Sequence, residues 1–203
     1  MKTYTVIDTN VIVSSMLTGN PTSPTKWILS KIREKNIIPI INADILEEYA
    51  DVLSRDKFHF LQEDIDNMLQ LFRTRGIVYT PECLRQDFID LNDVIFYETY
   101  RLKEDSYLVT GNLRHFPSEP RIVPPADMMS ILLLSEESSG NLLSEPVSIY
   151  ITDDMERAWE AVERMHATAV ANGIADMSME EIDEEIRQYR EERRKRRLEE
   201  LKK

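Results

Sequence analysis

The chain of 203 residues has a formal net charge of −12 and 42% apolar residues, which indicates an acidic globular protein. No apolar run approaches the roughly 18 residues that cross a bilayer, and the start lacks the regions of a signal peptide. Cys83 is the only cysteine, so an intrachain disulfide and a cysteine-rich zinc site are excluded. We expect a protein of the reducing cytoplasm without a membrane partner. A general nucleic-acid binder would be basic.

Strand and helix patterns alternate over the first two thirds of the sequence. Short apolar runs predict strands, and apolar residues that recur every three or four positions predict helices. We expect strands at 3–7, 37–41, 77–79, 107–109 and 122–123, and helices around 27–32, over 42–55 and 62–75, from 93 to about 102, and after 125 to about 134. Strands separated by helices need parallel crossover connections. The sequence therefore predicts a three-layer α/β fold, with a short parallel sheet flanked by helices.

A change in composition divides the chain. Residues 135–148 are rich in serine, glutamate and turn-forming residues, which is typical of a linker. We therefore expect a domain over residues 1–134, a linker over 135–148 and a helical tail over 149–203. Residues 149–151 are expected as a short strand or docking segment.

The tail contains two helical patterns. The first spans about 153–171 and precedes Gly173, a typical helix-ending residue. The second begins at Ser178, which has the capping-box spacing to Glu181. The apolar stripes are Ala158, Trp159, Val162, Met165 and Ala169 in the first helix, and Ile182, Ile186 and Tyr189 in the second. Stripes this narrow cannot form their own core, so the tail must dock on the first domain or another chain, or remain mobile.

Asp8 ends the apolar run of the first expected strand. Open α/β sheets bind ligands beyond the carboxyl ends of their strands, so an aspartate there is well placed to meet a ligand. Asn10 and Ser14 follow closely and carry polar side chains. The structural alternative is an Asx turn or a helix cap at Asp8.

The expected helix over 42–55 brings two adjacent glutamates. With residues placed at 100° intervals, Glu48 lies roughly 100° from the centre of the apolar face and Glu47 roughly 160°. We therefore expect Glu48 at the border of the buried face, where it can reach a site at the sheet edge. Glu47 is expected on the surface.

Two further positions complete the candidate site. Asp93 lies near a helix start, where the helix dipole favours a negative charge. Asp90 is expected to cap that helix while Asp93 is the ligand, although the reverse arrangement is open. Asn112 follows the fourth expected strand as Asp8 follows the first, but it brings no charge.

These side chains form an all-oxygen ligand set without clustered histidines or thiolates, which suits Mg²⁺ or Mn²⁺. Such an ion can polarise a phosphodiester, generate hydroxide from bound water and stabilise the leaving oxygen. Asp8 and Asp93 are expected to hold the metal, with Glu48 as a further ligand or as the residue that orients the water. The residues expected to support these ligands or contact the substrate are Asn10, Ser14 and Asn112.

Four segments carry a family resemblance. They are Val-Ile-Asp-Thr-Asn-Val from residue 6, Leu-Glu-Glu-Tyr-Ala-Asp-Val-Leu-Ser-Arg from 46, Asp-Leu-Asn-Asp-Val-Ile-Phe-Tyr-Glu from 90, and Leu-Val-Thr-Gly-Asn-Leu-Arg-His-Phe-Pro from 108. In this order they resemble the PIN-domain nucleases, and within them the VapC-like toxins of bacterial toxin–antitoxin systems. The resemblance covers residues 1 to about 134. It implies a metal-dependent ribonuclease with Asp8, Glu48 and Asp93 as its acidic residues. The wider family commonly has aspartate where this chain has Asn112, which leaves the number of metal ions open.

The tail carries a second resemblance. Residues 171–186 are similar to the C-terminal segment of antitoxins that wrap such a nuclease and block its site. This implies a toxin joined to an antitoxin-like tail, which acts on its own domain or on a neighbouring chain. Arg187 and Arg190 fall beside the apolar stripe, and either could compete with metal or RNA at the acidic site. The alternative is pairing within the helix, such as Asp183 with Arg187.

Three functions remain open from the sequence. The first is a Mg²⁺- or Mn²⁺-dependent endoribonuclease that hydrolyses RNA, is restrained by the tail and forms a homodimer. The second is a catalytically silent PIN-like protein that binds RNA or another partner, which Asn112 and the acidic charge favour. The third is a phosphatase of the haloacid-dehalogenase type, which also has an aspartate after its first strand. Asn10 argues against it, because that chemistry needs a second aspartate there.

Overall fold

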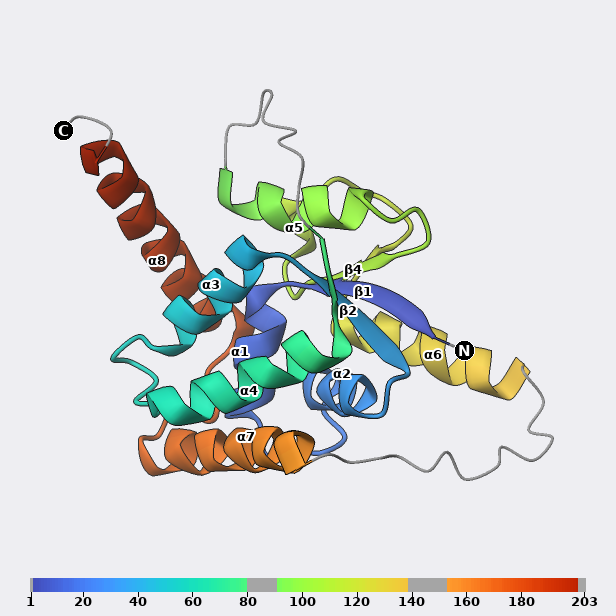
Figure 1. Ribbon diagram of the computed structural model, residues 1–203, viewed down its shortest axis with the longest axis horizontal. Helices are drawn as coiled ribbons and strands as arrows, with labels where there is room; N and C mark the ends of the chain where they lie inside the picture. The colour runs from blue at the N-terminus through green and yellow to red at the C-terminus, as the bar shows by residue number, and fades with distance from the viewer. Residues whose placement is uncertain (1, 80–90, 139–152, 201–203) are drawn as a thin grey trace.

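A computed structural model describes residues 2–79, 91–138 and 153–200 (Figure 1). Its centre is a sheet of parallel strands in the order β3-β2-β1-β4-β5. The strands are β1 (Thr3–Ile7), β2 (Ile37–Ile41), β3 (Ile77–Val78), β4 (Tyr107–Val109) and β5 (Ile122–Val123). All of them lie where the apolar runs predict them, and β3 is one residue shorter than expected.

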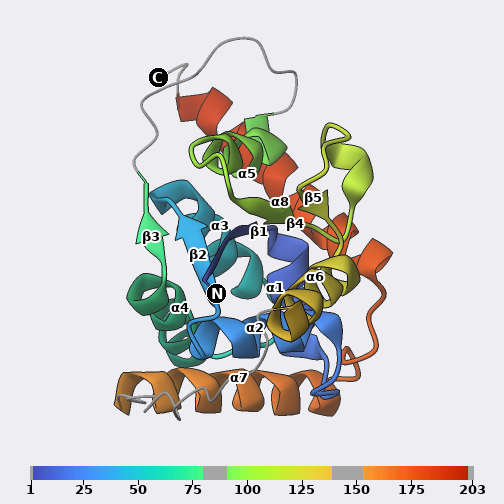
Figure 2. The ribbon, with the colours of Figure 1, turned by 90° about the vertical axis from the view of Figure 1, so that its right-hand side faces the viewer.

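Helices cover both faces of this sheet. They are α1 (Thr9–Leu17), α2 (Pro24–Arg33), α3 (Ala43–Leu53), α4 (Gln62–Arg75), α5 (Leu91–Arg101), α6 (Pro125–Ser138), α7 (Asp153–Ala171) and α8 (Met179–Glu200), with a single 3₁₀ turn η1 (Leu113–His115). Figures 1 and 2 show α5 on one side of the sheet and α2 and α4 on the other. The predicted three-layer α/β fold with a C-terminal helical region is therefore confirmed.

The central strand β1 determines where the candidate site lies. Val6 and Ile7 are fully buried, as expected for a parallel strand that is covered on both faces. β1 pairs with β4 in a register that places Ile7 beside Val109. The residues that follow, Asp8 and Thr110, therefore leave the sheet next to each other at its carboxyl edge.

Helix α1 is the main element that the sequence did not predict. It begins directly after Asp8 and is rich in β-branched residues, which have low helix propensity. Every residue of α1 except Ser14 is buried. A helix buried on all sides has no polar face, so it lacks the amphipathic spacing that identifies a surface helix.

Three helix boundaries agree with the residues that predict them. Asn42 caps α3 by accepting a hydrogen bond from the Ile45 N–H at 2.8 Å. Ser178 and Glu181 form the expected capping box before α8, with hydrogen bonds of 2.8 and 3.3 Å. Gly173 follows α7 with a φ of 70°, a conformation that glycine adopts without strain.

The tail docks on the first domain of the same chain. α7 packs against α4 and α1 as a further layer, which Figures 1 and 2 both show. Its side chains that join the core of the sheet are Met155, Ala158, Val162, Met165 and Ala169. α8 contacts α1 and α3, and it buries Ile182, Ile186 and Tyr189. Of the arrangements open to the tail, the described residues show docking in cis.

The predicted linker is only partly described. α6 continues to Ser138 instead of ending near residue 134. Glutamate and serine need not stop a helix, and glutamate has high helix propensity, which accounts for the extension. Residues 139–148, and the expected segment at 149–151, lie outside the described residues. In the described part of the chain, no helix is long and apolar enough to cross a membrane.

Candidate active site

Asp8 takes the N-cap position of α1, but its carboxylate makes no capping hydrogen bond. The Thr110 hydroxyl instead donates to Asp8 Oδ2 at 2.6 Å. The Asp8 backbone N–H donates to the Val109 carbonyl oxygen at 2.9 Å, which continues the contact between β1 and β4. A cap therefore accounts for the backbone position of Asp8 but not for its buried carboxylate.

Glu48 brings a second buried carboxylate to the same edge. It is 1% exposed, whereas Glu47 lies on the surface, as the helical spacing predicts. The Thr9 hydroxyl, next in sequence to Asp8, donates to Glu48 Oε1 at 2.6 Å. Two buried carboxylates repel each other and lose hydration, so this arrangement favours a positive charge between them.

Arg190 of α8 supplies that charge. Its Nη2 lies 2.7 Å from Glu48 Oε1 and 3.7 Å from Asp8 Oδ1. Its Nε also donates to Glu48, at 3.2 Å from Oε1 and 3.3 Å from Oε2. The guanidinium carbon lies 5.7 Å from the centre of the Phe96 ring. The guanidinium thus bridges the two carboxylates and is almost entirely buried with them.

The neighbouring arginines of α8 contact other groups. Arg187 pairs with Glu184 of the same helix, and 65% of its side chain is exposed. Arg193 pairs with Glu47 at the surface of α3. Arg187 therefore forms an ion pair within its own helix, as the alternative prediction states, but its partner is Glu184 and not Asp183. The structure brings Arg190, and not Arg187, to the carboxylates.

The amide side chains of Asn10 and Asn112 converge on α8. Asn10 Nδ2 donates to Asp183 Oδ1 at 2.8 Å, and Asn112 Nδ2 donates to Asp183 Oδ2 at 3.2 Å. The Gly111 N–H donates to Asn10 Oδ1 at 3.0 Å, which links α1 to the segment after β4. α8 therefore contacts the carboxyl edge of the sheet through one acidic and one basic side chain, Asp183 and Arg190.

Of the remaining candidate residues, Ser14 is not brought into these contacts. The Ser14 hydroxyl lies 3.3 Å from the Thr25 hydroxyl of α2, so its contact is with a neighbouring helix. Asp93 lies in the first turn of α5, which packs on β1, β2 and β4. The side chain of Asp93 lies outside the described residues, and so does the whole of Asp90.

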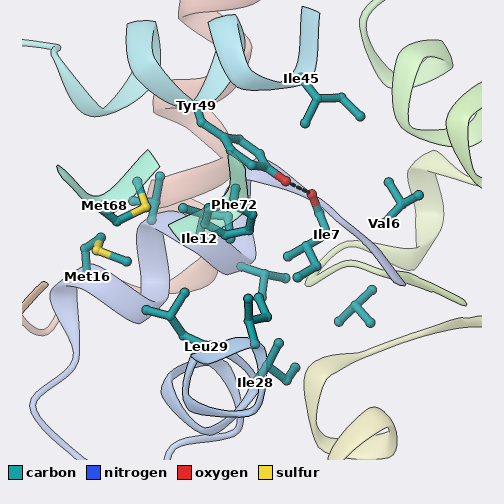
Figure 3. Packing of buried hydrophobic residues seen from close by; sticks show 14 of the residues in the cluster. Val6, Ile7, Ile12, Met16, Ile28, Leu29, Ile45, Tyr49, Met68 and Phe72 are labelled. Atoms are coloured by element: carbon teal, nitrogen blue, oxygen red, sulfur yellow. Dashed lines mark hydrogen bonds between the residues drawn. The ribbon is translucent and has the colours of Figure 1, made fainter. Parts of the chain in front are cut away.

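Tyr49 connects the site to the hydrophobic core. Its ring packs edge-on against Phe72, with centroids 5.4 Å apart, and its hydroxyl donates to the Ile7 carbonyl oxygen (Figure 3). Burial raises the pKa of the Tyr49 hydroxyl well above its usual value, and the negative charges of Asp8 and Glu48 raise it further. The hydroxyl therefore stays protonated and holds the backbone just before Asp8.

Four residues that make these contacts were not predicted as residues of the site: Thr9, Tyr49, Thr110 and Asp183. Thr9 and Thr110 lie within two residues of Asp8 and Asn112, the strand-end residues that the sequence does predict for the site. A hydroxyl side chain so close to such a residue is the feature that could have identified them. Tyr49 looks like an ordinary core residue of an amphipathic helix. Asp183 has helical spacing to Arg187, which suggested a different partner.

The described ligands suit a hard cation. Asp8 and Glu48 offer carboxylate oxygens, which favour Mg²⁺ or Mn²⁺ over softer metals. The guanidinium of Arg190 shows that this pair accommodates a positive charge. Among the described side chains no group of three or more metal-ligating residues occurs, and Asp93 is not one of those side chains. The two carboxylates thus fit a divalent ion, and Asp93 is the candidate for a third ligand.

The sheet order and the acidic edge define an α/β domain whose polar site lies at the carboxyl ends of β1 and β4. A family model described as PIN domain matches residues 4–114, more than half of the chain, and the protein belongs to the PIN-domain family. PIN domains are generally nucleases and typically use divalent metals. The match includes Asp8, Glu48 and Asn112 and ends before the tail. Comparisons with curated proteins and with solved structures found no match.

Proposed function

We propose that this protein is a Mg²⁺- or Mn²⁺-dependent endoribonuclease of the toxin–antitoxin type, similar to the VapC-like toxins, with an antitoxin-like tail in the same chain. The observation that carries the proposal is the Arg190 guanidinium between the buried carboxylates of Asp8 and Glu48. A buried acidic pair that needs a cation in place is suited to hold a metal ion when the arginine withdraws.

In this proposal Asp8, Glu48 and Asp93 hold the metal ion. Such an ion would supply Lewis-acid chemistry, lowering the pKa of a water molecule and offsetting negative charge on the scissile phosphate. The protein positions the carboxylates. The Thr110 hydroxyl donates to Asp8 Oδ2, whereas Arg190 lies beside Oδ1, so withdrawal of α8 removes a cation from the Oδ1 side of this carboxylate.

The tail restrains the nuclease in the proposed resting state. Arg190 contacts the two carboxylates that would hold a metal ion, so the arginine and the ion would compete for them. α8 reaches the site of its own chain, which supports inhibition in cis. RNA is the substrate class that membership of the PIN-domain family favours.

The substitution Arg190→Ala in the full chain tests this function. We expect metal-dependent cleavage of a fluorescent RNA to rise by roughly tenfold or more, because the carboxylates lose their internal competitor. EDTA should abolish the cleavage. Arg187→Ala is the matched control, since it removes the same charge from the same helix at a surface position. It should leave cleavage at the parental level.

The carboxylates are tested in the same background. Adding Asp8→Asn or Glu48→Gln to Arg190→Ala should lower cleavage by roughly 10–100-fold or more, because loss of a metal ligand should cost at least as much as loss of a group that only orients one. Circular dichroism would verify that each double variant is folded. Cleavage that is unchanged in both double variants would overturn the proposed site.

A catalytically silent PIN-like protein that binds RNA or another partner is the second candidate. The observation that favours it is Asn112, which contributes a neutral amide bonded to Asp183 where an additional carboxylate would add a metal ligand. If Arg190→Ala binds RNA without metal-dependent turnover, this second function replaces the first.

A further inference from the structure

The carboxylate of Asp183 is held by two amides from different segments of the domain. Asn10 comes from the first turn of α1, and Asn112 follows β4. Each amide donates to a different oxygen of the same carboxylate, at 2.8 and 3.2 Å. This arrangement is a two-point anion site, and an acidic residue of the tail occupies it.

The orientation of both amides is determined within the domain itself. The Gly111 N–H donates to Asn10 Oδ1 at 3.0 Å, and the Arg114 N–H donates to Asn112 Oδ1 at 3.3 Å. A backbone N–H can only donate, so each amide oxygen is engaged there and each NH₂ group points the other way. Asn10 is moreover 2% exposed, which restricts its movement. The hydrogen bonds that orient the two donor groups therefore do not involve Asp183.

The second hydrogen of the Asn112 amide also has a neighbour. Asn112 Nδ2 lies 3.0 Å from His115 Nε2 in the turn η1. An amide NH₂ group carries two donors, so one can serve the histidine ring while the other serves the bound anion. This contact further holds the Asn112 side chain in place.

We propose that Asn10 and Asn112 form the phosphate-binding subsite of the nuclease, and that Asp183 occupies it as an internal substitute for an RNA phosphate. The proposal rests on the proposed function. A phosphodiester carries one negative charge shared by two non-bridging oxygens, so it offers two amide donors the same pattern of acceptors as a carboxylate does. Neutral amides also avoid adding charge beside Asp8 and Glu48.

The spacing of Asp183 and Arg190 on α8 relates the phosphate subsite to the acidic site. Asp183 and Arg190 are seven residues apart, which is about two helical turns, so both project from one face of the helix. Asp183 meets the amides and Arg190 meets the carboxylates. One face of α8 thus presents an anion and a cation to the subsites for the substrate phosphate and for the metal ion.

Phosphate binding by the full chain carrying Asp183→Ala tests the subsite. Inorganic phosphate is added in the presence of EDTA, and the side-chain amide resonances of Asn10 and Asn112 are followed by ¹⁵N NMR. We expect both resonances to shift saturably, with an affinity roughly tenfold or more above that of the parent, because the internal competitor is gone. Glu184→Ala is the control, because it removes a neighbouring charge whose partners are Arg187 and Gln188, and it should behave like the parent.

Two further variants test whether the phosphate response depends on a loosened α8 or on the amide of Asn10. Asp183→Asn keeps the side-chain shape if the alanine variant loosens α8, and it should bind phosphate too. Asn10→Ala combined with Asp183→Ala should remove the phosphate response of Asn112. Absence of saturable shifts in both Asp183 variants would overturn the subsite. Shifts with acetate but not with phosphate would show a carboxylate latch only and would also overturn it.

A short RNA distinguishes the two sources of phosphate. Under the same metal-free conditions, an RNA oligonucleotide should displace inorganic phosphate from Asn10 and Asn112. RNA that leaves bound phosphate in place would overturn the assignment to RNA in favour of a small free anion. Since no turnover is measured, a failure of the proposed ribonuclease activity would leave these resonance shifts intact and would be recognised separately.

Discussion

The hydroxyl of Tyr49 contributes to stability and to the position of Asp8 at the same time. Tyr49→Phe removes the donor to the buried Ile7 carbonyl oxygen. We expect the free energy of unfolding, measured by urea denaturation, to fall by about 1–3 kcal/mol. Tyr4→Phe is the control, because it keeps the ring that contacts Lys103. It should change the free energy by less than about 0.5 kcal/mol.

The pH dependence of stability follows from the same hydroxyl. Burial raises the folded-state pKa of Tyr49 above the unfolded value, which is about 10, so only the unfolded state loses the proton as the pH passes that value. The contribution of Tyr49 is therefore complete below about pH 10 and declines as the pH rises further. Between about pH 9.5 and 11, the parent should lose stability more steeply than Tyr49→Phe. Equal slopes would contradict this assignment.

Individual side chains could be predicted where helical periodicity alone decides their surroundings. Glu48 differs from Glu47 by one step of 100°, and that step separates a buried carboxylate from a surface one. Thr110 and Asp183 could not be placed in this way. Their contacts depend on the register between β1 and β4 and on how α8 docks, and neither can be obtained from local spacing.

Both helices of the tail make ion pairs with the domain, which for α7 are Arg164 with Asp64 and Glu163 with Lys26, but the two helices bury different numbers of apolar side chains. α7 buries a continuous apolar face, and each fully buried methionine or valine contributes roughly 1.5–3 kcal/mol. α8 buries a shorter stripe and adds a series of ion pairs with the domain. Those pairs join Arg55 to Glu185 and Glu192, Lys57 to Glu185, and Arg193 to Glu47. Several partners are about half exposed, so each pair contributes roughly 0–1 kcal/mol and is screened by salt.

Hydrogen exchange should separate these two helices. Raising the salt concentration from about 0.1 M to 1 M shortens the Debye length from roughly 10 Å to 3 Å. We expect faster amide exchange in α8 and little change in α7, measured by mass spectrometry of peptides from each helix. The matched control is α4, which α7 covers. Equal acceleration of α7 and α8 would show that the tail opens as one unit.

Most helices and strands could be predicted because each has a regular pattern of apolar residues and a recognisable residue at one of its ends. The strands read as short apolar runs, and α3, α7 and α8 end or begin at Asn42, Gly173 and Ser178. α1 could not be predicted, because burial on all sides removes the periodicity and β-branched residues suggest a strand. Its helix is stabilised by tertiary packing against α2, α3 and α7.

The docking of both tail helices within one chain changes what to expect of the oligomer. A homodimer was expected because the apolar stripes needed a partner, but the stripes are buried against the same chain. The apolar stripes therefore no longer argue for a homodimer. Their docking within the chain favours the proposal that the tail acts on its own domain. The parallel sheet and the three layers could be predicted from the alternation of strands and helices. The order of the strands within the sheet and the path of α8 across the site could not.

Mixing two variants tests restraint in cis. Asp8→Asn chains keep α8 but lack a metal ligand, and they are added in roughly tenfold excess to active Arg190→Ala chains. If α8 acts only within its own chain, cleavage by Arg190→Ala should be unchanged. Parental activity per molecule should also stay constant over about a hundredfold dilution, since an intramolecular contact does not depend on concentration. Inhibition by the added chains would demonstrate action in trans.

The place of α7 in the core has a consequence for the order of events during synthesis. Without α7 the part of α4 that faces α7 has no cover, although α4 still packs against β2, α2 and α3, so the domain cannot complete its packing until the ribosome has made α7. Arg190 follows Gly173 by about 17 residues, which take about 1–3 s to add at roughly 5–20 residues per second. A newly made chain therefore gains its finished fold and the arginine beside Asp8 and Glu48 within seconds of each other. Under the proposed function, a nuclease without its restraint would be present only for that interval.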